Sequence, residues 1–330
     1  MQGLVRLDGL ASIVEAMRGA RVAVLGDLVV DEYVYGQTER ISREAPVLIV
    51  RQEYTERKLG GAANAAANLA ALGVKTFALG VVGDDDAGRA LVELCEAAGI
   101  VPCVEVAPGP TETKTRILAG GINTTRQQML RVDRCRESPL PEDVHDRLVG
   151  RLHEVLADCD LLVVSDYGGG VLGPRMIEEV RRLSREGLRV CVDSRYDLGA
   201  YVGTYLVKPN EPELAAATGL PVGTHESTLA AAAALRERLG CHAVLATRGR
   251  SGMVLVRKGE EPLAIPVHGE EEAVDVTGAG DTVIATLAAA LGAGADLASA
   301  ARLANVAGGI VVRKPGTATV RPEEILRELS

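Results

Sequence analysis

The sequence alternates short apolar runs, typical of buried strands, with amphipathic stretches of helical period. The apolar runs lie at residues 21–30, 75–82, 160–164, 189–193, 205–208 and 242–247. The amphipathic stretches between them include residues 87–98, 142–156, 175–185 and 227–239. Strands that are apolar on both faces and separated by helices are typical of a parallel sheet covered by helices on both sides. The sequence therefore predicts an α/β fold.

Two segments interrupt this pattern, because apolar and polar residues alternate in them with no helix between the strands. They lie within residues 33–59 and 113–133. Alternation of period two is typical of strands with one buried and one exposed face. We interpret the segments as a small antiparallel sheet that projects from the main domain as a lid. Two ordinary surface hairpins remain an equal alternative.

The charge balance argues against a nucleic-acid partner. The chain has 36 Lys and Arg against 45 Asp and Glu, which gives a net charge of −9. Affinity for nucleic acids rests largely on neutralisation of phosphates by Lys and Arg. One Phe, seven Tyr and no Trp also leave few side chains on which bases can stack. The sequence thus predicts small-molecule partners and no nucleic acid.

Cysteine spacing and hydropathy predict a cytoplasmic protein with no membrane partner. The six cysteines are scattered and include no C-x-x-C pair, which favours reduced thiols over a disulfide framework or a zinc site. The N-terminus lacks the apolar core of a signal peptide. The longest Ala-rich apolar stretch, residues 282–291, is about half of the roughly 20 residues that a membrane-spanning helix needs.

Several familiar catalytic motifs are absent from the sequence. No Gly-Lys dipeptide occurs, which excludes a Walker A loop. Val283 stands where the third glycine of a dinucleotide fingerprint would follow Gly278 and Gly280, and Met253 stands where a nucleophile elbow needs its second glycine. Neither His-Glu pair has the second histidine of a zincin.

The strongest motif is Asp-Val-Thr-Gly-Ala-Gly-Asp-Thr at residues 275–282, directly before an Ala-rich helical run. Small residues at the start of a helix leave backbone N–H groups bare, and the helix dipole adds to their attraction for an anion. Asp281 among these amides makes sense as a base for an incoming hydroxyl that attacks a bound phosphoryl group. Its pKa needs no upward shift, because the proton moves late in such a reaction. The alternative is an acidic residue that only complements the helix dipole.

A second motif, Gly-Gly-Ala-Ala-Asn at residues 60–64, also opens a predicted helix, which extends to about residue 72. Its glycines allow close approach of a ligand, and the amide of Asn64 suits a sugar hydroxyl. Tight helix packing at a glycine turn is the alternative. Asp27 and Asp31 follow the first strand, where ligands bind in α/β folds, although a solvated strand end explains them equally well.

The two glycine motifs resemble, in order and spacing, the two signatures of the ribokinase-like (pfkB-type) carbohydrate kinase family. Residues 26–50, 126–133 and 163–167 carry a narrower similarity to D-glycero-D-manno-heptose-7-phosphate kinases of lipopolysaccharide-precursor synthesis. The resemblance implies that residues 1–330 form a single kinase domain. That domain would be a three-layer α/β/α fold with a mainly parallel central sheet and a small antiparallel lid.

The resemblance also implies site residues for the acceptor. Asp281 would be the base, and Gly278, Ala279 and Gly280 would form the anion hole for the transferred phosphoryl group. The acceptor would be bound by Asp31, Gly60, Gly61, Asn64, Asp27, Asp166 and Arg116. The lid would close to exclude water, and a homodimer through the lid is a further expectation.

On the nucleotide side, the resemblance implies ATP and Mg2+, with K+ as a further possible cofactor. Nucleotide-binding roles fall on Asn210, Glu213, Thr247, Arg248, Gly249, Asn305 and Lys208. Asn210 and Glu213 would hold Mg2+ through its waters, and they also fit a helix cap with a first-turn acid. Asp275 and Thr277, with the loop at residues 312–317, would form a monovalent-cation site.

The sequence departs from the heptose kinases at the far end of the sugar. These kinases usually carry lysines where this chain has Gly169 and Asp193-Ser194-Arg195. Positive charge for a sugar phosphate would then come from Arg40, Arg116, Arg126 or Lys208. An insertion at residues 120–125 departs from the pattern as well. The nucleotidyltransferase domain that is fused to some relatives is not expected here.

The resulting hypothesis is an ATP-dependent kinase for the C1 hydroxyl of heptose 7-phosphate. One alternative is a kinase for another sugar or a nucleoside, such as ribose, a fructose phosphate or adenosine. A non-catalytic regulator that binds a nucleotide or a sugar with the same fold is the other, although it leaves the combination of base and anion hole unexplained.

Overall fold

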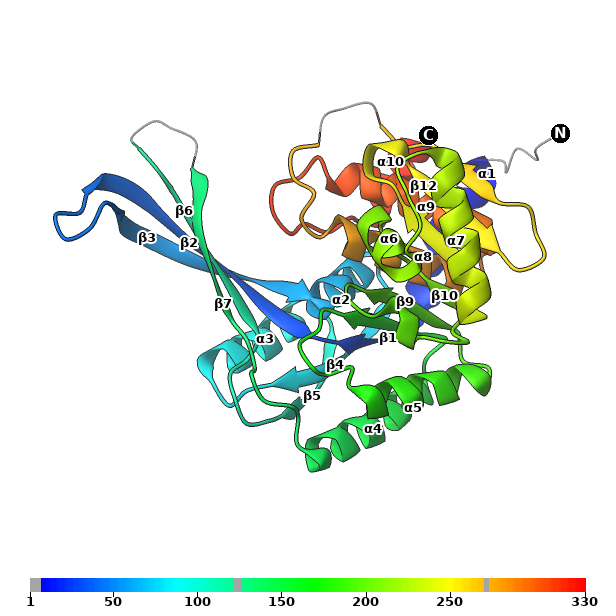
Figure 1. The fold of residues 1–330 in the computed structure, drawn as a ribbon, viewed down its shortest axis with the longest axis horizontal. Coiled ribbons are helices and arrows are strands. Elements are labelled where there is room, and N and C mark those ends of the chain that lie inside the picture. The colour runs from blue at the N-terminus through cyan, green and yellow to red at the C-terminus, as the bar shows by residue number, and fades with distance from the viewer. Residues whose placement is uncertain (1–6, 122–125, 270–272) are drawn as a thin grey trace.

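A central sheet of nine strands forms the middle layer of the part of the chain that a computed structural model describes, residues 7–121, 126–269 and 273–330 (Figure 1). The inserted residues 122–125 lie outside the described part of the chain. The strand order is β13-β12-β11-β10-β9-β8-β1-β4-β5. The strands are β1 (Arg21–Gly26), β4 (Lys75–Val82), β5 (Val101–Val106), β8 (Leu161–Asp166), β9 (Val190–Ser194), β10 (Leu206–Val207), β11 (Ala243–Thr247), β12 (Met253–Arg257) and β13 (Leu263–Ile265).

The pairings of this sheet are parallel from β5 to β11, and only β12 and β13 join it antiparallel. Alternate side chains of each strand enter two separate cores. Val22 and Val24 of β1 belong to one core, and Ala23 and Leu25 belong to the other. Because both faces are buried, the strands read as continuous apolar runs in the sequence.

Two sets of helices complete a three-layer α/β/α fold, as predicted. Residues of one core come from α1 (Leu7–Ala16), α2 (Ala62–Ala71), α3 (Asp86–Ala97), α8 (Ala279–Gly292), α9 (Leu297–Val311) and α10 (Pro322–Leu329). Residues of the other come from α4 (Glu142–Leu156), α5 (Pro174–Arg185), α6 (Glu211–Thr218) and α7 (His225–Leu239). Short 3-10 turns lie at Met17–Gly19, Leu198–Ala200 and Gly249–Ser251.

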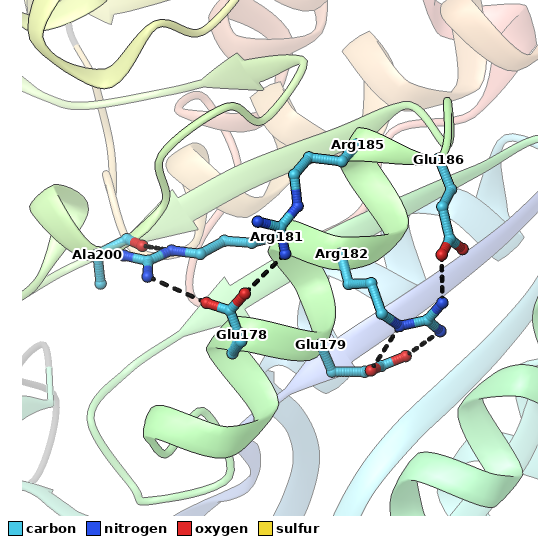
Figure 2. A network of polar contacts seen from close by, with 7 residues as sticks. All are labelled: Glu178, Glu179, Arg181, Arg182, Arg185, Glu186 and Ala200. Carbon is cyan, nitrogen blue, oxygen red and sulfur yellow. Dashed lines mark hydrogen bonds and ion pairs between the residues drawn. The ribbon is translucent and has the colours of Figure 1, made fainter.

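The α5 helix shows how a covering helix divides its residues. Its inner face buries Met176, Val180 and Leu183. Figure 2 shows the outer face, where three arginines and three glutamates form a network and Arg181 also donates to the carbonyl of Ala200 at 2.6 Å. Exposed pairs of this kind contribute about 0.3–0.5 kcal/mol each, so burial of the inner face determines how the helix packs.

A second sheet extends away from the central one (Figure 1). Its four described strands, in the order β3-β2-β6-β7, are β2 (Leu28–Ile41), β3 (Leu48–Gly61), β6 (Thr113–Gly120) and β7 (Gln127–Arg134). The two predicted segments therefore form one sheet instead of two separate hairpins. The outer pairings are antiparallel, whereas β2 and β6 pair in parallel, which alternation alone does not reveal.

The strand predicted at residues 21–30 is in fact two strands, because the chain changes sheets at Asp27. β1 ends at Gly26 in the central sheet, and β2 begins at Leu28 in the second one. A Cβ atom at Gly26 would lie 1.9 Å from the backbone oxygen of Ser165, so only glycine fits between these strands. The apolar run in the sequence gives no sign of this break.

Gly26→Ala tests this constraint, with Gly150→Ala as the control. The Ser165 backbone that the added methyl group would meet belongs to a central strand and cannot move aside, so we expect a loss of about 3 kcal/mol or more in the free energy of unfolding. Gly150 is exposed within α4 and an added Cβ meets nothing within 4 Å, so its substitution should stabilise by about 0.5–1 kcal/mol. Urea unfolding measures the free energy of unfolding of both variants. Equal stabilities of Gly26→Ala and Gly150→Ala would contradict the steric constraint at Gly26.

Candidate active site

A cavity of about 500 Å³ lies between the N-terminus of α8, the ends of the central strands and the second sheet. Acidic and basic side chains face each other across it. It is lined by Asp31, Gly61, Lys114, Arg116, Gln128, Arg131, Asp166, Tyr167, Asp193, Arg195, Lys208, Asn210, Glu213, Thr247, Val276, Thr277, Gly278, Gly280, Asp281 and Thr317.

Asp281 lies in the first turn of α8 and is 4% exposed. Its Oδ2 accepts a hydrogen bond from Asn64 Nδ2 at 2.7 Å, and its Oδ1 accepts one from the Tyr167 hydroxyl at 2.8 Å. Burial raises the pKa of Asp281 to about 6, although both hydrogen bonds oppose the shift. The pKa is thus raised by burial, although the reaction itself is not expected to need this shift.

The start of α8 supplies backbone donors beside this carboxylate. Gly278 caps the helix with φ 77°, and a Cβ there would lie 2.6 Å from Asn64 Nδ2. The first N–H groups of a helix have no intrahelical acceptor. Ala279 N–H donates to the Val276 carbonyl, and the N–H groups of Gly280 and Asp281 have no acceptor within the described residues. Two backbone donors at the cavity wall are thus without an acceptor, which is the arrangement that an anion site requires.

Asn64 lies beside Asp281 but does not line the cavity. It is buried in the first turn of α2, after Gly61 with φ 55°. Its Nδ2 donates to Asp281, and its Oδ1 faces the Nδ2 of Asn68 at 3.4 Å. One N–H of Asn64 and one lone pair of its Oδ1 are thus engaged within the protein, and the hydrogen bond from Asn64 to a sugar hydroxyl stays a prediction.

Asp31 and Arg116 form a buried ion pair on the wall made by the second sheet, with Oδ1 and Nη1 2.6 Å apart. A Cβ at Gly60 would lie 2.7 Å from the Asp31 carboxylate, so this glycine makes room for Asp31 without itself lining the cavity. The alternative of a solvated strand end is wrong for both acids of this segment, since Asp27 and Asp31 are buried.

Asp27 does not line the cavity, so its predicted contact with the substrate stays a prediction. Its carboxylate accepts backbone N–H groups of Tyr167, Gly169 and Val171 at 2.8–3.2 Å, so it holds the loop that carries Tyr167. Asp166 does line the cavity, and its Oδ2 accepts hydrogen bonds from the hydroxyls of Ser194 and Tyr201, both at 2.8 Å.

A second, larger cavity of about 830 Å³ adjoins the first. The two share Thr247, Val276 and Gly280, so they meet at the N-terminus of α8. Of the predicted nucleotide-binding residues, the second cavity is lined by Thr247, Gly249 and Asn305. Apolar side chains such as Met253, Val267, Val283 and Val312 form much of the rest of its wall. Each cavity is large enough for a small ligand, and two ligands bound in them would touch at Gly280.

Asn210 and Glu213 form a capping box at the start of α6, as the helix-cap interpretation predicts. Glu213 N–H donates to Asn210 Oδ1, and Asn210 N–H donates to Glu213 Oε2. Both residues also line the first cavity. Arg248 lines neither described cavity, and its Nε pairs with Glu211 at 3.2 Å.

Lys208 lies beside Gly280 and pairs with Asp193, with Nζ and Oδ2 3.0 Å apart. Burial alone would lower the pKa of Lys208, but Asp193 and Glu213 more than offset it and raise the pKa. The ammonium group therefore stays charged at the point where the two cavities meet.

Asp275 joins two loops behind the candidate anion site. Its carboxylate accepts the N–H groups of Thr277 and Gly316, both at 2.9 Å. Burial favours the neutral acid, but these hydrogen bonds outweigh it and lower the pKa of Asp275. Thr317 Oγ1, in the same loop as Gly316, is buried with no hydrogen-bond partner.

Of the four cations predicted to face a sugar phosphate, Arg116 and Lys208 line the first cavity, where each is paired with a carboxylate. Arg40 and Arg126 do not line it. Arg40 is exposed on β2, and Arg126 pairs with Glu53 and lies over the Tyr35 and Tyr54 rings.

Three further cations that line the cavity, Lys114, Arg131 and Arg195, were not identified from the sequence. Lys114 Nζ lies 5.2 Å and Arg195 Cζ 5.5 Å from the centre of the Tyr167 ring. In the described ranges neither of them forms an ion pair, whereas Arg131 pairs with Asp133. Arg195 thus keeps one of the two charges that the sequence departures indicated as moved or lost. Gly169 keeps none, because a Cβ there would lie 2.9 Å from the Asp27 carboxylate.

The described residues contain neither a cluster of metal ligands nor a membrane-spanning helix. Over residues 7–121, 126–269 and 273–330, no three His, Cys, Asp or Glu side chains are grouped so that they could hold a metal ion. No described helix is long and apolar enough to cross a membrane.

Comparison with known sequences finds one family and a set of close relatives. The model of the family described as pfkB family carbohydrate kinase matches residues 20–324. The Bifunctional protein HldE of Paramagnetospirillum magneticum is 44% identical over 98% of this chain, which covers 66% of that protein. Its namesake from Pelobacter propionicus is 40% identical over 97% of this chain and 65% of its own length. The chain thus spans a little under two thirds of these relatives.

Solved structures share the fold at lower identity. Phosphofructokinase-2 from Escherichia coli in complex with fructose-6-phosphate has a TM-score of 0.77 at 18% identity, over 94% of this chain and 98% of that one. Ribokinase from Arabidopsis thaliana, complexed with ribose and ATP, has a TM-score of 0.71 at 21% identity, over 94% and 99%. These likenesses show the ribokinase-like fold.

The raised pKa of Asp281 predicts a pH-dependent cost in stability. The folded protein binds the Asp281 proton more tightly than the unfolded chain, so stability decreases as pH rises from about 4 through 6. Asp281→Asn lacks this ionisation. At pH 8 we expect the variant to be more stable than the wild type by up to about 3 kcal/mol, and the difference should vanish near pH 4. Thermal melts from pH 4 to 8 measure this, and a constant difference would contradict the shift.

Proposed function

We propose, from the premise that this chain belongs to the pfkB family of carbohydrate kinases, that it transfers the γ-phosphate of ATP to the C1 hydroxyl of a heptose 7-phosphate. One observation carries the proposal: two cavities meet at Gly280, and Asp281 borders the smaller one at that junction. The sequence similarity to heptose-7-phosphate kinases and the 40–44% identity to the HldE proteins support this acceptor.

In the proposed mechanism, Asp281 takes the proton of the acceptor hydroxyl. The hydroxyl oxygen forms a bond to the γ-phosphorus, and the bond from that phosphorus to the β–γ bridging oxygen of ATP breaks. The N–H groups of Gly280 and Asp281 and the ammonium of Lys208 face the charge on the transferred group. With a pKa of about 6, Asp281 is ionised at pH 7 and ready to accept the proton.

The larger cavity would hold the nucleotide, with Thr247, Gly249 and Asn305 on its wall. Asn210 and Glu213 would hold Mg2+ through its waters. Their oxygen donors fit the ion, and a magnesium ion that keeps its waters needs no cage of three acidic side chains. When bound, Mg2+ neutralises charge on the phosphates. Asp275 and Thr277, with the loop at residues 312–317, would form a site for K+ that steadies the anion hole.

The smaller cavity would hold the acceptor. Asp31, Gly61 and Asp166 offer hydrogen-bonding groups for sugar hydroxyls. Lys114 and Arg195 are the cations that we assign to the 7-phosphate, because neither forms an ion pair among the described residues. Two cavity cations outside ion pairs favour a phosphorylated acceptor over ribose or adenosine.

Residues 1–330 would act as one kinase domain with the second sheet as its lid. Lys114 and Arg116 face the cavity, and neighbouring residues of β6 alternate between faces, so Thr115 and Ile117 face outward. Leu130 pairs with Ile117 on that outer face and is 55% exposed. Covering this apolar surface would favour a homodimer through the lid. Use of ATP accords with the predicted cytoplasmic location.

Loss of the base tests the reaction itself. The purified protein with Mg2+ and ATP should release ADP in proportion to heptose 7-phosphate, and ribose, adenosine and fructose 6-phosphate should be poor acceptors. Asp281→Asn should lower kcat by about a hundredfold or more, since general-base catalysis contributes about 10²–10⁴. A coupled ADP assay measures both. Near-normal turnover of the variant would refute the role of Asp281, and an inactive wild type would refute the kinase assignment.

Loss of the cavity cations tests the acceptor. Lys114→Ala and Arg195→Ala should each raise KM for the phosphorylated sugar about tenfold or more and leave KM for ATP within twofold, because a charge-assisted hydrogen bond contributes about 1.5–3 kcal/mol. Arg126→Ala is the matched control, since Arg126 directly precedes β7 of the second sheet but lies outside the cavity. Equal KM values in all three variants would place the sugar phosphate elsewhere.

A further inference from the structure

Asn64, which contacts Asp281, is itself held by a second buried asparagine. Asn68 lies one turn later on α2, and its Nδ2 donates to the backbone carbonyl of Asn64 at 3.0 Å and faces Asn64 Oδ1 at 3.4 Å. Thr282, the residue after Asp281, donates from Oγ1 to Asn68 Oδ1 at 2.9 Å. All four residues are buried. The bonds therefore lead from α8 across α2 and back to the base.

The direction of these hydrogen bonds is fixed at both ends. A backbone carbonyl only accepts, so Asn68 must turn its NH2 group toward Asn64. The carbonyl oxygen of Asn68 then faces the Thr282 hydroxyl, which lies 2.9 Å from it and 3.3 Å from the backbone carbonyl of Gly278. The shorter distance favours donation to Asn68. At the other end the ionised Asp281 also only accepts, so Asn64 must present its NH2 group to Asp281 and its oxygen to Asn68. Each amide thus has one satisfied orientation.

We infer that Thr282, Asn68 and Asn64 are positioning residues that hold the Asp281 carboxylate in place for proton transfer. The inference rests on the proposed function, in which Asp281 is the base. Its physical content is that Asn64 cannot turn its oxygen toward Asp281 while Asn68 holds it. We call these three residues the relay. With the Asn64 oxygen turned toward Asp281, the two oxygens would repel each other and displace the carboxylate, and the relay prevents this.

Thr282→Val tests the relay without touching either asparagine. Valine has nearly the same shape as threonine but lacks the hydroxyl, so the buried Asn68 oxygen loses its donor. We expect kcat to fall about three- to tenfold, with KM for the sugar within twofold. The acid limb of kcat/KM should move upward by about half a pH unit, because full loss of a hydrogen bond to a carboxylate corresponds to about one unit or more.

Two further variants separate the relay from a general effect on α8. Thr282→Ser keeps the hydroxyl and should restore the wild-type acid limb. Thr286→Val is the matched control, since Thr286 lies one turn later on α8, is equally buried, and its hydroxyl has no hydrogen-bond partner among the described residues. It should leave kcat and the pH profile unchanged. Thermal melts of all variants report on folding separately.

Failure of the relay and failure of the proposed function give different results. An unchanged acid limb and kcat in Thr282→Val, the same changes in Thr286→Val, or no rescue by Thr282→Ser would overturn the relay. A raised KM for the sugar with unchanged kcat in Thr282→Val would assign Asn64 to sugar binding instead and also overturn it. A wild type that phosphorylates none of the acceptors would instead refute the proposed function.

Discussion

An ionisable carboxylate buried at the N-terminus of a helix is the constraint on which the rest of this site depends. Burial favours the neutral form of Asp281, and only donors placed around it keep its pKa near 6 instead of higher. Asn64 and Tyr167 each supply one donor. Because these donors come from α2 and from the loop after β8, the anion links three segments that lie far apart in the sequence.

The glycines of both motifs are explained by this close approach. Gly278 adopts φ 77° and leaves room for the Asn64 amide, while Gly60 leaves room for the Asp31 carboxylate. A side chain at either position would separate α2 from α8 or the second sheet from the cavity. The two motifs therefore act as one arrangement: each provides the space that a polar residue of another segment occupies.

The sequence predicted the layers of the fold well, because strands buried on both faces differ clearly from helices in their apolar pattern. It missed the break at Asp27, since the residues on both sides are apolar although they belong to different sheets. The motifs also indicated which segments form the site. The partners of each side chain could not be predicted, because Asn64, Asn68 and Tyr167 meet Asp281 or its neighbours only through tertiary packing.

The charged residues show the same limit of prediction from the sequence. Arg126 and Lys114 look alike in the sequence, each a cation of the segment at residues 113–133. In the structure, Lys114 lies next to Asp31 of β2 at the cavity, whereas Arg126 precedes β7 and pairs with Glu53. Lys114 forms no ion pair among the described residues although Asp31 and Asp133 are its register neighbours, since these carboxylates pair with Arg116 and Arg131 instead. A cation becomes available to a ligand only where other cations already occupy the nearby carboxylates. The specificity of such a site therefore resides in side-chain pairing across the sheet as much as in residue type.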